Sequence, residues 1–209
     1  YPLRRQRLMC IRVSFVRKIA VIFVTDVVAF SKMMEKNEDE TLRSFRLCRD
    51  ILDNLFEEYG GRVFNTAGDS VLAEFQSAVS AVICAKEFQK LIRQRNLNVE
   101  EESQMTFRVG LNMGDVIVEG DNLYGDGVNV AARLEALSQH GGVCLSKSIM
   151  DFVNKKTDLE FYDLGEQKVK NTNVHAFDVV DSDLEKRKLY SSKDIDEETS
   201  KAPTIAVLP

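Results

Sequence analysis

The chain has 209 residues, of which 44% are apolar and 29% are charged, so it is long enough for one well-buried core and a small appendage. Its formal net charge of −5 provides no overall positive field, and we therefore expect no nucleic-acid partner held by bulk electrostatics. Because no run of about 18 uncharged apolar residues occurs, we also expect no membrane contact within this chain.

The first third of the chain predicts a lead, a strand and a helix. Residues 1–17 place arginines around short apolar stretches without a cleavage signal, which indicates a basic lead or linker. Residues 18–25 (KIAVIFVT) form an apolar, β-branched run typical of a central strand buried on both faces, and the run ends at Asp26. From Glu38 to Tyr59 apolar residues recur at helical spacing until Gly60, which predicts an amphipathic helix.

The next segments predict a hairpin, a helix and more strands. Residues 62–66 and 70–75 are strand-like runs joined through a tight turn, with Asp69 at the tip of the hairpin. Residues 78–92 mark a second amphipathic helix, and a polar connector follows at 96–104. Residues 105–119 then predict two strand segments, broken near residues 112–115.

The remaining elements complete one domain, from residue 18 to 180. A glycine-punctuated loop at 120–127 leads into a helix at about 128–137, a strand follows at 143–146, and short helices and strands alternate after it. This order is typical of a ferredoxin-like α+β fold, a mainly antiparallel sheet with helices packed on one face. Residues 181–201 are densely charged and predict a solvated linker, whereas 202–209 (APTIAVLP) are typical of the first strand of a further domain.

The four cysteines predict the compartment. Cys10, Cys48, Cys84 and Cys144 lie far apart and show neither metal-binding nor redox spacing, and two of them fall on apolar helix stripes. We therefore expect buried free thiols, which implies a reducing, cytoplasmic location.

Two aspartates are the first candidates for chemistry. Asp26 ends the first predicted strand and Asp69 occupies the hairpin turn, and in a ferredoxin-like sheet these two elements are neighbours. Both carboxylates can therefore converge above one edge of the sheet. Such a place suits Mg²⁺, which prefers a few carboxylates completed by phosphate oxygens and water.

A second candidate set opens the helix after the glycine-rich loop. Asn129 and Arg133 are four residues apart, so the amide and the guanidinium share one helix face and could contact ribose and phosphate together. By itself the pair fits a hydrogen bond on a helix surface equally well, and a short glycine-rich stretch is a weak phosphate-loop signal.

Taken together and in order, four stretches of this sequence resemble the catalytic domains of class III adenylyl and guanylyl cyclases, most of all bacterial ones. The resemblance covers roughly residues 18–180, and the closing residues resemble the opening of a TolB-like domain. The stretches are VIFVTDVVAFS, GRVFNTAGDSVLAEF, VGLNMGDVIVEGDNLYGDGVNVAARLEAL and LGEQKVKNTNVHAFDV.

This resemblance implies a phosphorus–oxygen lyase of signal transduction, in which the ribose 3′-oxygen attacks the α-phosphate and pyrophosphate leaves. By position, Asp26 and Asp69 become the ligands of two Mg²⁺ or Mn²⁺ ions, with the backbone carbonyl of Val27 assisting. The family also implies a homodimer whose two sites lie at the subunit interface.

Three further residues receive roles from the same resemblance. Asn129 would orient the ribose, Arg133 would stabilise charge on the phosphate in flight, and Lys170 would hold the terminal phosphates.

The positions that would read the base depart from the family. Adenylyl cyclases commonly carry Lys and Asp or Thr where this chain has Asn65 and Asn122, and guanylyl cyclases commonly carry Glu and Cys. An asparagine amide both donates and accepts, so the pair fits either purine edge. We expect ATP as substrate, with GTP as the alternative, because the acidic residue typical of guanine recognition is absent.

Two other interpretations compete. A diguanylate cyclase shares the paired carboxylates, but it would need a Gly-Gly-Asp/Glu-Glu-Phe-like turn where residues 67–70 read AGDS. A catalytically silent domain that binds nucleotide and regulates a downstream module is favoured by Asn65 and Asn122, and is opposed by the intact metal and phosphate residues.

Overall fold

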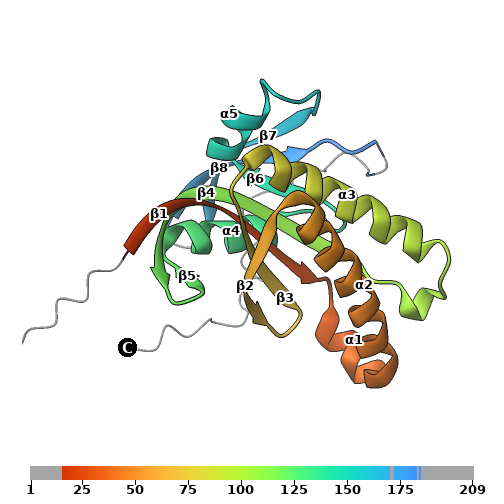
Figure 1. The fold of residues 1–209 in the computed structure, drawn as a ribbon. Helices are drawn as coiled ribbons and strands as arrows, with labels where there is room; N and C mark the ends of the chain where they lie inside the picture. The colour runs from red at the N-terminus through yellow and green to blue at the C-terminus, as the bar shows by residue number, and fades with distance from the viewer. Residues whose placement is uncertain (1–15, 170–171, 183, 185–209) are drawn as a thin grey trace, which may run out of the picture.

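The computed structural model describes residues 16–169, 172–182 and 184. Within them a curved eight-stranded sheet runs in the order β2-β3-β1-β4-β6-β8-β7, with β5 paired to β4 off this path (Figure 1). The strands are β1 (Val16–Val27), β2 (Gly61–Ala67), β3 (Ser70–Phe75), β4 (Phe107–Glu119), β5 (Asn122–Tyr124), β6 (Val143–Ser146), β7 (Phe161–Val169) and β8 (Thr172–Val179). The helices are α1 (Phe30–Lys36), α2 (Glu38–Tyr59), α3 (Ala78–Asn96), α4 (Asp126–Leu137) and α5 (Lys147–Val153), with a 3-10 turn at Glu101–Ser103.

The α+β class is confirmed, and the sheet is mainly antiparallel as predicted. Its strand pairs are antiparallel apart from β4 and β6, which run parallel. The predicted strands, the hairpin and the two long helices are all present, with ends that differ by a few residues.

From Ala20 onward the central strand β1 is buried on both faces, as its apolar run predicts, whereas Lys18 and Ile19 at the start of that run are exposed. Val21 and Phe23 pack with α2 and α3 on one side of the sheet. Ile22 and Val24, which alternate with them along the strand, pack with α4 on the other side. The strand therefore separates two apolar clusters and fixes the position of its own last residues.

Capping residues stabilise the ends of α2 and α3, and Gly60 stops α2 where the sequence predicts. The Asn37 side chain accepts a hydrogen bond from the Glu40 backbone N–H at the start of α2, and Gly60 ends that helix in the left-handed conformation, with φ of +76°. At the start of α3 the Ser77 hydroxyl accepts from the Ser80 N–H in the same way.

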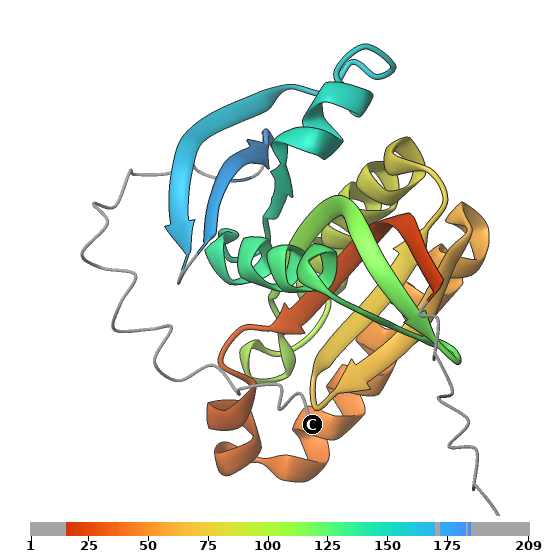
Figure 2. The same cartoon turned by 90° about the vertical axis from the view of Figure 1, so that its left-hand side faces the viewer.

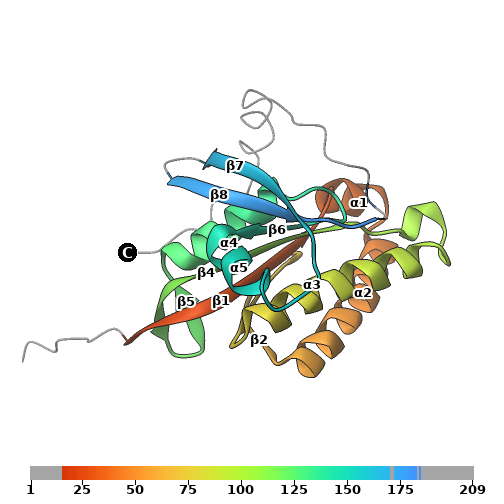
Figure 3. The same cartoon turned by 90° about the horizontal axis from the view of Figure 1, so that it is seen from above.

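The prediction that the helices pack on one face is wrong for α4. This helix crosses the face of β1 and β4 opposite to α2 and α3, and the two rotated views show it on the other side of the sheet (Figures 2 and 3). Gly110 of β4 allows the close approach, because a Cβ there would overlap the Glu135 nitrogen and the Ala131 carbonyl oxygen.

The predicted break near residues 112–115 is also wrong, because β4 continues unbroken through this stretch. Asn112 is buried, and its amide donates to the Gly127 carbonyl oxygen at 2.9 Å, so a polar residue is accommodated within the strand. The glycine-rich segment that follows contains the short strand β5, which folds back on β4.

Each edge of the sheet carries an irregularity. The pairing of β2 with β3 shifts register between Val63 and Asn65. At the other edge the pairing of β7 with β8 shifts between Asp163 and Gly165, where Gly165 has φ of +70°. The two outermost strands of the described sheet are therefore bent.

The expectation of buried free thiols is confirmed for Cys48, Cys84 and Cys144, and Cys10 lies outside the described residues. Burial raises the pKa of Cys48 to about 11 and that of Cys84 to about 12. Where the chain is described, its helices are either too short or too polar to cross a bilayer. The lead at 1–15 and the segment from residue 185 onward, which holds most of the predicted linker and the last strand, lie outside the described residues.

Candidate active site

The turn of the β2–β3 hairpin brings Asp69 to the end of β1. The Val27 backbone N–H donates to Asp69 Oδ2 at 3.0 Å, and Gly68 adopts φ of +62° to form the turn. Burial raises the pKa of Asp69; its backbone hydrogen bonds oppose this shift, and the neighbouring Asp26 charge adds to it. The structure therefore brings the two predicted carboxylates together, with Val27 between them.

These residues have the donor chemistry that Mg²⁺ requires. In the described part of the chain no group of three or more acidic, histidine or cysteine side chains is arranged to hold a metal. Mg²⁺ commonly binds through one or two carboxylates, with water and substrate phosphates completing the octahedron. Asp26, Asp69 and the Val27 carbonyl fit that incomplete set of hard oxygen ligands.

Arg108 is a site residue that the sequence analysis missed. It lies opposite Asp26 in the pairing of β1 with β4, and its guanidinium donates hydrogen bonds to both carboxylate oxygens of Asp26. Arg108 Nε donates to Asp26 Oδ1 at 3.2 Å, and Nη2 donates to Oδ2 at 2.8 Å. The Arg108 side chain is 22% exposed and that of Asp26 is 17% exposed, so the pair is shielded from most of the solvent.

Glu135, on the buried face of α4, is the second residue missed. Its Oε1 lies 2.9 Å from Arg108 Nε, but the Nε–H points toward Asp26, so this contact is an ion pair without an aligned hydrogen bond. Burial, followed by a hydrogen bond with Asp26 and the Asp26 charge, raises the pKa of Glu135. Asp26, Asp69 and Glu135 thus surround one guanidinium, leaving a local excess of acidic groups.

The predicted pair on α4 points away from this acidic cluster. At 100° per residue, Arg133 lies about 160° around the helix from Glu135, and Asn129 lies about 120° from it. Asn129 is exposed. Arg133 Nη1 is enclosed by the protein and finds no hydrogen-bond partner among the described residues. One copy of the chain therefore does not bring the two sets of predicted residues together.

The two asparagines predicted to read the base lie on neighbouring strands. Asn65 is exposed on β2, where its side-chain oxygen accepts from the Thr66 N–H at 2.8 Å. Asn122 is half-buried at the start of β5, which contacts β2. Arg62 Nη1 joins the two elements by donating to the Asp121 carbonyl oxygen at 2.9 Å. Lys170 lies outside the described residues.

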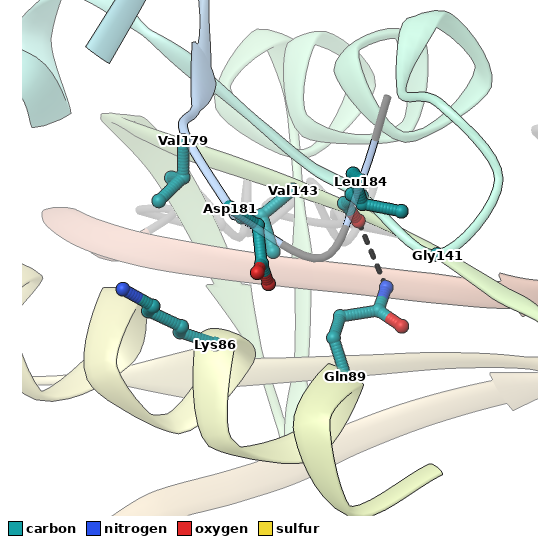
Figure 4. A pocket seen from close by; sticks show the side chains of 8 residues that line it. Lys86, Gln89, Gly141, Val143, Val179, Asp181 and Leu184 are labelled. Atoms are coloured by element: carbon teal, nitrogen blue, oxygen red, sulfur yellow. Dashed lines mark hydrogen bonds between the residues drawn. The ribbon is translucent and has the colours of Figure 1, made fainter. Parts of the chain in front are cut away.

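A small cavity beside α3 is separate from these residues (Figure 4). Gln89 borders it and donates to the Gly142 carbonyl oxygen at 2.8 Å, and Lys86 and Asp181 also line it. Its volume of about 10 Å³ leaves room for about one water molecule. The cavity is therefore too small for a nucleotide.

Comparison with known proteins gives consistent matches. The family model described as "Adenylate and Guanylate cyclase catalytic domain" matches residues 12–181. The chain is 39% identical over 200 residues to a protein of Rhizobium meliloti (strain 1021) named "Putative adenylate cyclase 3", and the match covers 94% of the chain. It spans only 34% of that relative's length.

Solved structures agree on the fold. An adenylate/guanylate cyclase/hydrolase from Silicibacter pomeroyi is 34% identical, with a TM-score of 0.75 over 80% of this chain and 99% of its own. The adenylyl cyclase CyaB from P. aeruginosa is 23% identical, with a TM-score of 0.70 over 81% of this chain and 97% of its own.

Proposed function

Because the chain belongs to the adenylate and guanylate cyclase catalytic domain family, we propose that it converts a purine nucleoside triphosphate into the 3′,5′-cyclic monophosphate and pyrophosphate. The observation that carries the proposal is the meeting of Asp26 and Asp69 beside the Val27 N–H. Two neighbouring carboxylates that are partly shielded from water can bind the divalent cations that accompany a triphosphate. The three buried free thiols support a location in the reducing cytoplasm.

Asp26 and Asp69 would hold two Mg²⁺ or Mn²⁺ ions, with help from the carbonyl of Val27. When bound, such ions lower the pKa of an attacking hydroxyl and neutralise the triphosphate. The chain's own residues contribute position and fixed charge, so no strong side-chain base is required. We assign the terminal phosphates to Lys170.

The active unit in this proposal is a head-to-tail homodimer. Asn129 and Arg133 would orient the ribose and stabilise charge on the reacting phosphate, yet both lie on a different side of α4 from Glu135 and the acidic cluster. A two-fold pair solves this separation, since each copy lends its carboxylates to one site and its Asn129 and Arg133 to the other.

We propose ATP as the preferred substrate. The relative at 39% identity is named an adenylate cyclase, and neither Asn65 nor Asn122 is the acidic residue expected for guanine. Both amides can donate to and accept from a purine edge.

Product analysis tests the reaction directly. Purified protein is incubated separately with ATP and with GTP in the presence of Mg²⁺ or Mn²⁺, and the products are resolved by chromatography. We expect cyclic AMP in excess of cyclic GMP, and Asp26→Ala should reduce the rate by orders of magnitude while the fold is retained. Asp53→Ala removes an exposed carboxylate on α2 and serves as the control with the same charge change. Absence of both cyclic products would instead indicate a silent domain.

A mixing experiment tests the shared sites. Asp26→Ala and Arg133→Ala, each inactive alone, should form heterodimers in which one site carries both lesions and the other carries neither. Activity should return to at most about half of wild type per heterodimer. If subunit exchange is demonstrated and activity does not recover, the shared-site arrangement is wrong.

A further inference from the structure

The guanidinium of Arg108 occupies the two oxygens of Asp26 that a metal ion would use. It binds them with two different nitrogens, at 3.2 and 2.8 Å, which is the bidentate geometry in which an arginine and a carboxylate pair most strongly. Because both partners are mostly shielded, solvent screens the pair only weakly. A cation that binds these oxygens must therefore compete with the guanidinium for them.

Glu135 gives the guanidinium another partner at a comparable distance. Its Oε1 already lies 2.9 Å from Arg108 Nε, and this oxygen is enclosed and accepts no aligned hydrogen bond from the described residues. A modest rotation of the Arg108 side chain would align its N–H groups with Glu135 and release Asp26. The backbone position of Glu135 is set by the close packing of α4 on Gly110, so this alternative partner is preformed.

Charge balance favours such an exchange. Arg108 lies beside Asp26 and Asp69, and a dication brought to these two aspartates would repel a guanidinium left next to them. A guanidinium moved toward Glu135 keeps an oxygen partner and leaves the aspartates to the dication.

We propose that Arg108 is the resident counter-ion of Asp26, displaced when a divalent cation binds, and that Glu135 is the positioning residue that receives it. This inference rests on the proposed function, because it assumes a divalent-cation site at Asp26 and Asp69. It predicts that Arg108 and Glu135 act in opposite directions on metal affinity even when no nucleotide is present.

Direct binding of Mn²⁺ to the whole chain, without nucleotide, tests the exchange. The free Mn²⁺ signal in electron paramagnetic resonance is titrated against protein. We expect Arg108→Gln to bind Mn²⁺ several-fold more tightly than wild type because the competing charge is gone, and Glu135→Gln to bind several-fold more weakly. Arg49→Gln removes the same charge from an exposed pair on α2 and should leave the affinity unchanged.

The double variant separates positioning from a simple field effect. If Glu135 acts through Arg108, Arg108→Gln/Glu135→Gln binds Mn²⁺ as tightly as Arg108→Gln alone. If it binds more weakly than Arg108→Gln, Glu135 acts through its own charge and the positioning role is refuted. Should Arg108→Gln fail to fold in circular dichroism, Arg108→Lys replaces it, and tighter binding is again expected because a single ammonium cannot cover both oxygens.

Asp26→Asn distinguishes failure of this inference from failure of the proposed function. If Asp26→Asn binds Mn²⁺ as tightly as wild type, the metal site assigned to Asp26 and the proposed function are both refuted. Loss of binding in Asp26→Asn without tighter binding in Arg108→Gln or Arg108→Lys would keep the metal site and overturn the counter-ion role.

Discussion

Replacing Gly110 with alanine tests whether the contact between β4 and α4 is as close as the structure indicates. The added methyl group would overlap the Glu135 nitrogen and the Ala131 carbonyl oxygen, and would lie 2.7 Å from Glu135 Cα. All three atoms belong to helix backbone, so no side chain can rotate away, and α4 must move as a body.

The magnitude follows from two opposing terms. Overpacking of this kind typically costs about 1–3 kcal/mol and here falls at the upper end, because the clash is with backbone. Replacing glycine with alanine also lowers the conformational entropy of the unfolded chain, which stabilises the folded protein by about 0.4–1 kcal/mol. We expect the free energy of unfolding to fall by about 2 kcal/mol, which lowers Tm by about 4–8 °C for a chain of this length.

Thermal unfolding by circular dichroism, together with urea unfolding, measures the change. Gly114→Ala is the matched control, because its methyl group points from the same face of β4 but approaches Asn112 Nδ2 and Gly127 Cα at only 3.3 Å. The control should lose less than about 1 kcal/mol. Cyclase activity should fall in Gly110→Ala as α4 carries Arg133 out of position. Equal Tm values for Gly110→Ala and Gly114→Ala would refute the close packing.

Three shorter predictions concern the base, an ion pair and a thiol. If Asn65 contacts the purine, Asn65→Lys raises the ATP/GTP rate ratio and Asn65→Glu lowers it; unchanged ratios in both variants would exclude the contact. Burial raises the pKa of Glu74, but hydrogen bonds from Lys18 and Arg62 outweigh burial, and the net effect is a lowered pKa. The ionised Glu74 therefore stabilises the fold fully above its unfolded pKa of about 4.3. This stabilisation is lost progressively as the pH falls through the lower pKa of the folded state. The stability gap between wild type and Glu74→Gln in urea unfolding should therefore shrink below about pH 4, whereas a constant gap would assign it to packing. Cys84 is fully buried and its pKa is raised to about 12, so its thiol should resist alkylation at neutral pH until denaturant is added. Peptide mass mapping measures the labelling, and rapid labelling of the folded protein would contradict the burial of Cys84.

The sequence predicted the elements whose signals are local. The apolar run of β1, the helical spacing of α2 with Gly60 at its end, and the hairpin turn at Asp69 all depend on neighbouring residues, and all were found. The continuous strand β4 was not predicted, because Asn112 and Gly114 look like breakers. Their place in the strand depends on Gly127, which is distant in sequence.

The partners of Asp26 could not be predicted in the same way. Arg108 is 82 residues from Asp26, and their pairing depends on the register of β1 and β4. A weak signal was present in α4, since Glu135 is a charged residue four positions after the buried Ala131 on an otherwise apolar stripe. A charge at such a position calls for a buried partner, but it does not say which residue that partner is.

The bends at both edges of the sheet also limit how copies of the protein can associate. A straight outer strand would expose a row of unpaired backbone groups and invite further strands, an arrangement without a natural end. The register shifts at Val63 and at Asp163 interrupt that row on both sides. Growth into fibres by strand addition at these edges is thereby disfavoured.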